Sequence, residues 1–171
     1  MDKRVSEVRN LEFADHFVAA MSAAAFGVSI VTTEGEAGKF GLTVSAVSSV
    51  SAEPPLLLAC INRKNAVEQA ITSNKRFVVN LLSEHQEDLA KIFAGRPAQG
   101  IAYDFDKASW NSEHGMPVLR GATANFVCDL ESFSDAGTHR IFVGRVIHAM
   151  HNSDALPLVY SHRTFGKFVK L

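Results

Sequence analysis

The sequence predicts a mainly β protein, an antiparallel barrel that carries a few peripheral α-helices. Segments rich in β-branched and aromatic residues follow one another at hairpin spacing, whereas helical spacing is confined to three stretches. No repeat, low-complexity tract or linker divides the chain. With 171 residues and 47% hydrophobic content it can bury a sizeable core, so we expect one domain over residues 1–171.

The chain is expected to open with a helix and a hairpin. Apolar residues between Leu11 and Ala25 recur at three- and four-residue spacing, and Asn10 is available as the N-cap. We expect this helix to pack on a large apolar surface. Residues 27–33 and 41–51 are rich in β-branched side chains, and glycine and charge are dense between them. They are predicted to form a hairpin with an exposed tip.

The middle of the chain alternates short strands and helices. The apolar run "LLLACIN" after two prolines indicates a buried strand, and Asn65 can cap the following helix, with Glu68 in the capping-box position. "RFVVNLL" is the next predicted strand. Ser83 and Gln86 form a second capping box, which opens a helix that ends at "AGRP". Three further strands are predicted over residues 122–133, 139–150 and 157–168.

Charge and cysteine content exclude several classes of protein. The net charge is −1, from 17 basic and 18 acidic residues, so neither nucleic acid nor an anionic membrane is expected as a partner. Cys60 and Cys128 lie in apolar runs and indicate buried free thiols in a reducing compartment. The first residues lack a signal core, and no run approaches the ~20 apolar residues of a membrane span. We therefore expect a cytoplasmic protein.

Several common catalytic and cofactor motifs are missing from the sequence. Neither the glycine fingerprint of a Rossmann fold nor that of a P-loop occurs. The seven histidines are scattered, and the "HAMH" pair falls in or after a strand, where its spacing does not converge; we expect no metal site. The apolar surroundings of Cys60 argue against a thiol nucleophile, and the paired acids indicate solvated faces. No hydrolase constellation emerges.

The positive signal is the segment "GLTVSAVSSVS" with the turn that follows the next strand. In a strand, Thr43 and Ser45 share one face, where short hydroxyls would let a planar ring lie close to the backbone. Asn62, Arg63 and Lys64 then precede the start of a capped helix, a combination of charge and free amides that suits a phosphate. From the residues alone, an edge hairpin with a solvated turn remains the alternative.

Four segments in order resemble the short-chain flavin reductase family: "VSIVTTEGEAGKFGLTVSAVSSVSAEPPLLLACINRKNAV", "FVVNLLSEHQEDLAKIFAG", "GTHRIFVGRV" and "PLVYSHRTFGKF". The resemblance runs from about Phe13 to Phe168. It implies an FMN-binding split β-barrel that works as a homodimer, with the flavin near the subunit interface. It also implies the reductase component of a two-component flavin monooxygenase, such as one acting with a 4-hydroxyphenylacetate or phenol hydroxylase.

The resemblance also implies a set of site residues. Ser45 would lie nearest the reactive N5 edge of the flavin, and Lys64 would support the phosphate. The implied flavin contacts are Leu42, Thr43, Val44, Ser45, Ala46, Ser48, Ser49, Cys60, Ile61, Asn62, Arg63, Asn65, Ala66, Phe93, Ala94, Gly95 and Arg96. The implied nicotinamide contacts are His139, Tyr160, Ser161, His162 and Arg163. The family usually reads G-D-H where this chain reads "GTH", a departure that leaves the histidine in place.

The implied reaction is direct hydride transfer from C4 of NADH or NADPH to N5 of FMN or FAD, with no certain catalytic side chain; Ser45 and His139 would lie nearest. The sequence shows no clear basic pocket for a 2′-phosphate, which favours NADH, although Arg140, Arg145 and Arg163 leave NADPH open. Two alternatives remain. Reduced flavin could serve a corrin cobalt or a ferric complex instead of an oxygenase, or the chain could be a non-catalytic split barrel that binds flavin or haem.

Overall fold

The computed structural model describes the backbone of residues 3–169 and the side chains of residues 12–169. Strands dominate, as predicted. In chain order the elements are α1 (Lys3–Ser22), β1 (Phe26–Gly27), β2 (Ser29–Thr33), β3 (Phe40–Val44), β4 (Val47–Ala52), β5 (Pro55–Asn62), α2 (Ala66–Asn74), β6 (Arg76–Leu81), α3 (Glu87–Phe93), the 3-10 turn η1 (Phe105–Lys107), β7 (Trp110–Glu113), β8 (Met116–Leu119), β9 (Ala124–Ala136), β10 (His139–His151), β11 (Leu158–Ser161) and β12 (Thr164–Lys167).

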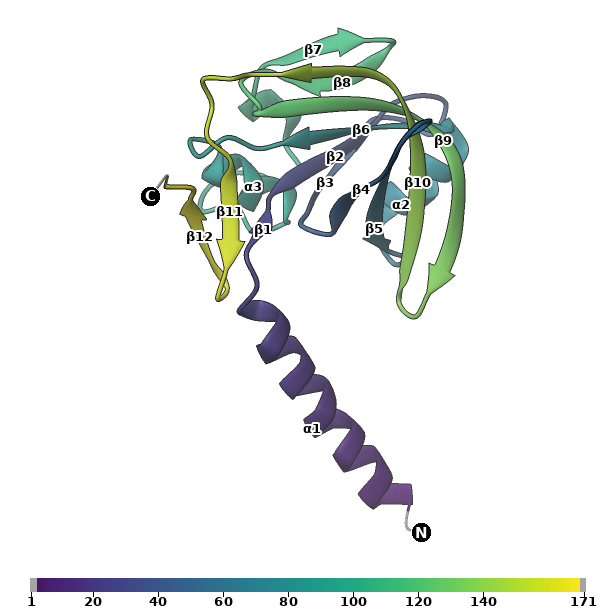
Figure 1. Cartoon of the computed structure of the whole chain (residues 1–171), viewed down its shortest axis with the longest axis vertical. Coiled ribbons are helices and arrows are strands. Elements are labelled where there is room, and N and C mark those ends of the chain that lie inside the picture. The colour runs from purple at the N-terminus through teal and green to yellow at the C-terminus, as the bar shows by residue number, and fades with distance from the viewer. Residues whose placement is uncertain (1–2, 170–171) are drawn as a thin grey trace.

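A seven-stranded antiparallel sheet forms the body of the molecule, with strand order β3-β2-β6-β9-β10-β5-β4. Strands β3 and β4 are consecutive in the chain yet lie at opposite edges of this sheet. The sheet therefore curls until its edges approach one another, and the chain crosses between them at Ser45 and Ala46 (Figure 1). This is the predicted antiparallel barrel.

The segment predicted as one long strand over residues 41–51 is thus two strands. Its first part pairs with β2 in the expected hairpin, with Ser29 opposite Val44 and Thr33 opposite Phe40. Its second part turns away and pairs with β5, where Val47 lies opposite Ala59. The small residues between them allow the sharp change of direction. The prediction was wrong in continuing the hairpin through this point.

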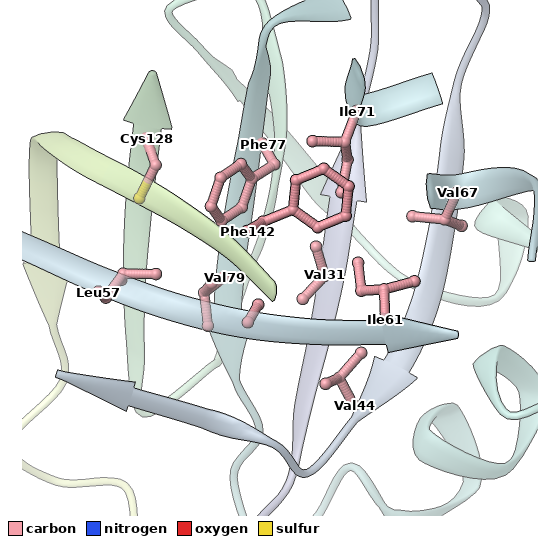
Figure 2. Close-up of a cluster of buried hydrophobic side chains, with 11 residues drawn as sticks. Val31, Val44, Leu57, Ile61, Val67, Ile71, Phe77, Val79, Cys128 and Phe142 are labelled. Atoms are coloured by element: carbon pink, nitrogen blue, oxygen red, sulfur yellow. The ribbon is translucent and has the colours of Figure 1, made fainter. Parts of the chain in front are cut away.

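The main core fills the inside of the barrel under α2. Phe77, Val79 and Phe142 project from β6 and β10, and Ile71 packs onto them from the helix (Figure 2). All four side chains are fully buried. Burial of about 1.5–3 kcal/mol per large apolar side chain makes this cluster the main stabilising feature of the barrel.

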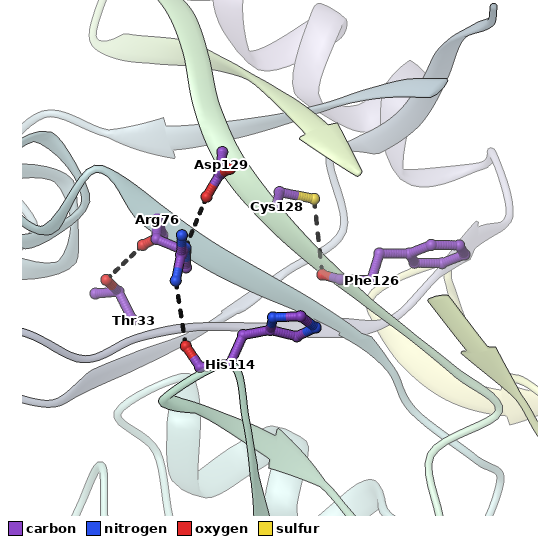
Figure 3. A network of polar contacts seen from close by, with 6 residues as sticks. All are labelled: Thr33, Arg76, His114, Phe126, Cys128 and Asp129. Carbon is purple, nitrogen blue, oxygen red and sulfur yellow. Dashed lines mark hydrogen bonds and ion pairs between the residues drawn. The ribbon is translucent and has the colours of Figure 1, made fainter. Parts of the chain in front are cut away.

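A polar contact fastens the barrel to the β7–β8 hairpin, which the sequence did not reveal. Arg76 Nε on β6 lies 2.7 Å from Asp129 Oδ1 on β9, and Arg76 Nη1 donates to the carbonyl oxygen of His114 at 3.2 Å (Figure 3). The predicted strand over residues 157–168 is also a hairpin, because β11 and β12 pair around a turn at His162 and Arg163.

The helix caps follow the predictions only in part. Asn65 Oδ1 accepts from Val67 N–H at 3.0 Å, as predicted for the cap of α2. Glu68 does not complete a capping box, since its buried carboxylate instead lies 2.6 Å from Arg140 Nη1 on β10. Gln86 Oε1 accepts from Ser83 N–H at 3.0 Å, but α3 begins only at Glu87. It ends before Gly95, as predicted.

Helix α1 differs most from expectation. Asn10 lies inside the helix, so it is not the N-cap. The helix projects away from the barrel, and Phe13, Phe17 and Met21 are exposed (Figure 1). The expected packing on a large apolar surface does not occur against the described residues of its own chain.

None of the helices within residues 3–169 is both long and apolar enough to cross a membrane.

Candidate functional site

The crossing at Ser45 and Ala46 exposes the middle of the predicted flavin-binding segment. Both residues are exposed to solvent. Ala46 O accepts from Cys60 N–H at 2.9 Å, and this hydrogen bond holds the crossing against β5. Because both side chains are small, a flat ligand could approach the backbone here, as the prediction requires.

A pocket of about 290 Å³, which we call the ring pocket, opens beside the crossing. It brings together three segments that the sequence analysis identified separately: the hydroxyl-rich strand, "FAGR" and "YSHR". Its volume lies at the small end of the range for ligand pockets. It is lined by Val28, Thr43, Ser45, Lys91, Ala94, Arg96, Tyr160, Arg163 and Phe165.

The walls of the ring pocket are held in place by packing and hydrogen bonding. Thr43 Oγ1 donates to Ala90 O at 2.7 Å, so this hydroxyl fixes α3 against β3 rather than offering its proton to a ligand. Tyr160 and Phe165 are half-buried and pack with their ring centroids 5.1 Å apart. They form an aromatic wall against which a planar ring can pack.

The turn between β11 and β12 places Arg163 in the ring pocket. His162 and Arg163 have positive φ angles of 49° and 61°, the left-handed conformation of a two-residue hairpin turn that favours Asn and Gly. Residues without glycine's freedom pay for this conformation in strain, which is often found at functional sites. The strain supports a functional role for Arg163.

A second pocket, of about 480 Å³, lies at the start of α2; we call it the lysine pocket. Lys39 and Lys64 bring two positive charges to it, and Lys39 Nζ lies 4.5 Å from the centroid of the Phe105 ring. Its lining also includes Phe40, Gly41, Asn65, Ala66, Val67 and Tyr103. Gly41 and Thr43 are neighbours on one face of β3, so the two pockets follow one another along this strand.

The backbone amides near Asn65 are less available than the sequence suggested. Arg63 N–H donates to Thr138 O, and Lys64 N–H donates to Asn62 Oδ1, both at 3.0 Å. Val67 N–H is taken by the Asn65 cap. The expectation of free amides at this turn is therefore wrong for these three groups. The lysine side chains supply most of the attraction for an anion.

The structure places His139 beside this turn and away from the other predicted nicotinamide contacts. His139 pairs with Asn62 across β10 and β5, and its Nδ1 lies 2.9 Å from Thr138 Oγ1. The tip of the β9–β10 hairpin and the β11–β12 turn lie well apart (Figure 1). One chain therefore does not bring His139 together with Tyr160 and Arg163.

Ion pairs stabilise the tip of the hairpin that carries His139. Arg140 Nε donates to Asp135 Oδ1 at 2.6 Å, and this hydrogen bond holds the pKa of Asp135 below its ordinary value. The same hydrogen bond, with the charge of Glu68, raises the pKa of Arg140. Two carboxylates thus offset the Arg140 charge, which makes it a structural residue more than a site for a phosphate.

The remaining predicted flavin contacts lie in other places. The side chains of Val44, Ile61 and Phe93 are buried in the core, so only their backbone could meet a ligand. Leu42 packs against the same core, and burial raises the pKa of the partly exposed Cys60 thiol. Ser48 and Ser49 line a separate apolar groove described below.

The predicted site did not include nine residues that line the two pockets: Val28, Lys39, Phe40, Gly41, Val67, Lys91, Tyr103, Phe105 and Phe165. Lys39 was assigned to an exposed tip. Tyr103 lies against Gly95, where an added Cβ would come within 2.6 Å of its hydroxyl oxygen. Tyr103 and Phe105 alternate with aspartates in "YDFD", which could have indicated that both rings face one side. The surrounding segment shows no helical or strand periodicity, so this pattern alone did not predict a site.

A comparison with known protein families identifies the family of this chain. The model of the flavin reductase like domain matches residues 21–168, which include both pockets. The chain belongs to the flavin reductase-like family. The family resemblance seen in the sequence is confirmed.

Relatives of this flavin reductase-like chain match along most of their length. The 4-hydroxyphenylacetate 3-monooxygenase reductase component of Salmonella dublin is 35% identical over 151 residues, 88% of this chain and 89% of the relative. FMN reductase (NADH) RutF 2 of Rhizobium rhizogenes is 36% identical over 158 residues, 92% and 88% of the two chains. The solved structure of flavin reductase PheA2 has a TM-score of 0.82 at 29% identity and covers 99% of this chain and 100% of that one. The split-barrel prediction is confirmed.

The residues of this flavin reductase-like chain fit a flavin. The ring pocket offers an aromatic wall, small residues and a hydroxyl to a planar heteroaromatic ring. The lysine pocket offers two cations to a phosphate. The two pockets are neighbours along β3, as the joined ring and phosphate of one nucleotide require.

Proposed function

We propose that this chain uses NADH to reduce FMN or FAD and supplies the reduced flavin to a partner oxygenase. The observation that best supports this is the ring pocket, in which three separate segments of the chain meet beside a lysine pocket on the same strand. The relatives named as an FMN reductase (NADH) and as a monooxygenase reductase component support the same activity.

The residues of the chain act by positioning. When bound, the nicotinamide supplies the hydride and the flavin accepts it, so no side chain has to transfer a proton. Ser45 keeps the mouth of the ring pocket small and polar, and the aromatic wall of Tyr160 and Phe165 orients a ring against it. Correct alignment of two reactants is worth several kcal/mol of the activation barrier, about 7–11 in favourable cases.

A homodimer is part of this proposal. His139 lies beside Asn62 at the tip of the β9–β10 hairpin, whereas Tyr160 and Arg163 line the ring pocket. If all three contact the nicotinamide, a second copy must contribute His139 to the ring pocket of the first. In a two-fold dimer the same contacts occur twice, so each copy would supply His139 to the other.

Binding measurements with FMN and riboflavin test the assignment of the lysine pocket. Riboflavin lacks the phosphate, so Lys39→Ala/Lys64→Ala should weaken FMN binding by roughly tenfold and leave riboflavin binding nearly unchanged. Arg120→Ala removes an exposed cation outside both pockets and serves as the control. Equal losses for the two ligands would contradict the assignment. Anaerobic titration with FMN, FAD, NADH and NADPH then defines the preferred pair.

A further inference from the structure

Helix α1 carries an apolar face that its own chain leaves open. Phe13 is 74% exposed and Phe17 is 59% exposed, and Val18 and Met21 are also exposed along the same side of the helix. Soluble proteins rarely leave several large apolar side chains together in water. Helices are stabilised mainly by packing of such a face, so a partner surface is expected.

The base of α1 is fixed so that the helix leads away from the barrel. His162 N–H donates to Ser22 O, and Ser161 Oγ donates to Ala23 O at 3.3 Å. Both groups belong to the β11–β12 hairpin. From this anchor the 20-residue helix extends for roughly 30 Å, beyond the body of the chain (Figure 1). Among residues 3–169, no element packs against its apolar face.

The barrel has an apolar groove of about 460 Å³ that is also open. Leu56 and Leu57 of β5, Phe126 of β9 and Val146 of β10 line it, as do Val47, Ser48 and Ser49 of β4. Ser29 Oγ, in its wall, is buried and has no hydrogen-bond partner among the described residues.

The total surface of the chain supports the same conclusion. Its accessible area is 10536 Å², whereas a compact monomer of 18.6 kDa exposes about 8,200 Å². The excess of roughly 2,300 Å² is larger than the ~800 Å² that each partner buries in a standard stable interface. The projecting helix α1 contributes to this extended surface (Figure 1).

We propose that α1 of each copy lies in the apolar groove of a second copy. The proposal rests on the homodimer that forms part of the proposed function, and it identifies the contact surface. Gly27 lines the groove and follows only five residues after the end of α1, so the helix base and the groove are adjacent on each copy. Two such contacts close under two-fold symmetry. Ser48 and Ser49 then face the helix of the second copy.

Analytical ultracentrifugation of the full chain tests this exchange of α1 between two copies. Wild type should be a dimer, and Phe17→Lys/Met21→Lys should raise the dimer dissociation constant by at least about a hundredfold, since two charges would enter an apolar groove. Both residues are exposed in the single chain, so the substitutions do not threaten its fold. Ala19→Lys places a charge on the opposite face of the same helix and should leave the dimer intact.

Hydrogen exchange tests whether α1 and the apolar groove form the dimer contact. Amides of residues 13–21 and of residues 47–57 should gain protection together as wild type is concentrated, and both should lose it in Phe17→Lys/Met21→Lys. A monomer, a dimer that survives the double substitution, or a dimer in which residues 13–21 exchange freely would each overturn the proposal.

Reductase activity separates this inference from the proposed function. Anaerobic bleaching of flavin by NADH reports the activity, and it is measured on the same samples. A dimer of the expected kind without activity would contradict the proposed function and leave the exchange of α1 standing. Activity in a protein whose α1 amides stay unprotected would support the proposed function and contradict the exchange of α1.

Discussion

At the scale of the residue, the exposed Ser45 lines the ring pocket at the crossing between β3 and β4. Ser45→Phe should abolish detectable flavin binding and turnover, because a large ring would occupy the space needed by the flavin. The unfolding transition should be unchanged, since Ser45 is exposed. Calorimetry and flavin fluorescence check both parts. The exposed Ser153→Phe is the matched control, and wild-type flavin affinity in Ser45→Phe would refute the placement of the ring.

Because the Cys128 thiol is buried, we expect the protein to lose stability at alkaline pH. Burial, with a smaller contribution from Asp129, raises its pKa from 9.0 to about 12. In the unfolded chain the thiol ionises near pH 9, so its contribution to stability is complete below pH 9 and is lost as the pH rises toward 12. Its Sγ lies 3.7 Å from Phe126 O, inside the sheet (Figure 3).

Chemical denaturation at several pH values measures this effect. The free energy of unfolding of wild type should fall more steeply between pH 9 and pH 12 than that of Cys128→Ala, although the variant is less stable at neutral pH. Lysines and tyrosines titrate in both proteins, so the difference between the two slopes isolates Cys128. Parallel slopes would mean that the thiol is accessible to water in the folded chain.

At the scale of the element, the β11–β12 turn combines strain with a predicted contact to nicotinamide. Arg163→Gly should raise the free energy of unfolding by up to about 1 kcal/mol, because glycine adopts the positive φ without strain. The same change should raise KM for NADH by about tenfold, because the guanidinium is lost. Arg163→Ala keeps the strain and should raise KM without the gain in stability. Unchanged KM in both variants would leave the turn with a structural role alone.

The ion pair of the buried Glu68 and the partly buried Arg140 joins α2 to β10, with their charged atoms 2.6 Å apart. Glu68→Ala should lower the free energy of unfolding, because the Arg140 guanidinium loses one of its two carboxylates and keeps only Asp135. Glu87→Ala removes a similar, more exposed pair with Lys91 and should cost less than about 1 kcal/mol. Urea unfolding measures the loss of stability in each variant. Equal losses would show that solvent screens both ion pairs alike.

Elements with a strong local signal were predictable from the sequence. The Asn65 cap and the strand β5 have short-range causes, and both were predicted correctly, although β5 is fully buried on one face only. The division of residues 40–52 into β3 and β4 was not predictable, because the choice of pairing strand depends on the curl of the whole sheet. Glu68 likewise left its expected cap because Arg140, distant in sequence, offered a stronger partner.

At the scale of the whole molecule, the candidate site is assembled from segments that only the fold brings together. The hydroxyl-rich strand, "FAGR" and "YSHR" were identified by resemblance, and the structure places residues of each in one pocket. Lys39 and Tyr103 could not be predicted, since nothing in their local sequence indicates that the chain returns to the start of α2. The position of His139 could not be predicted from the local sequence either, because it depends on the register between β5 and β10.

The central claim is that this barrel holds a flavin in the ring pocket and lets NADH reduce it there. Anaerobic rapid mixing of the flavin-loaded protein with NADH tests this most directly, with the visible absorption of oxidised flavin as the signal and Ser45→Phe as the comparison. The account predicts rapid, complete bleaching in wild type and none above the rate of free flavin in the variant. Bleaching in wild type no faster than that of free flavin would contradict it.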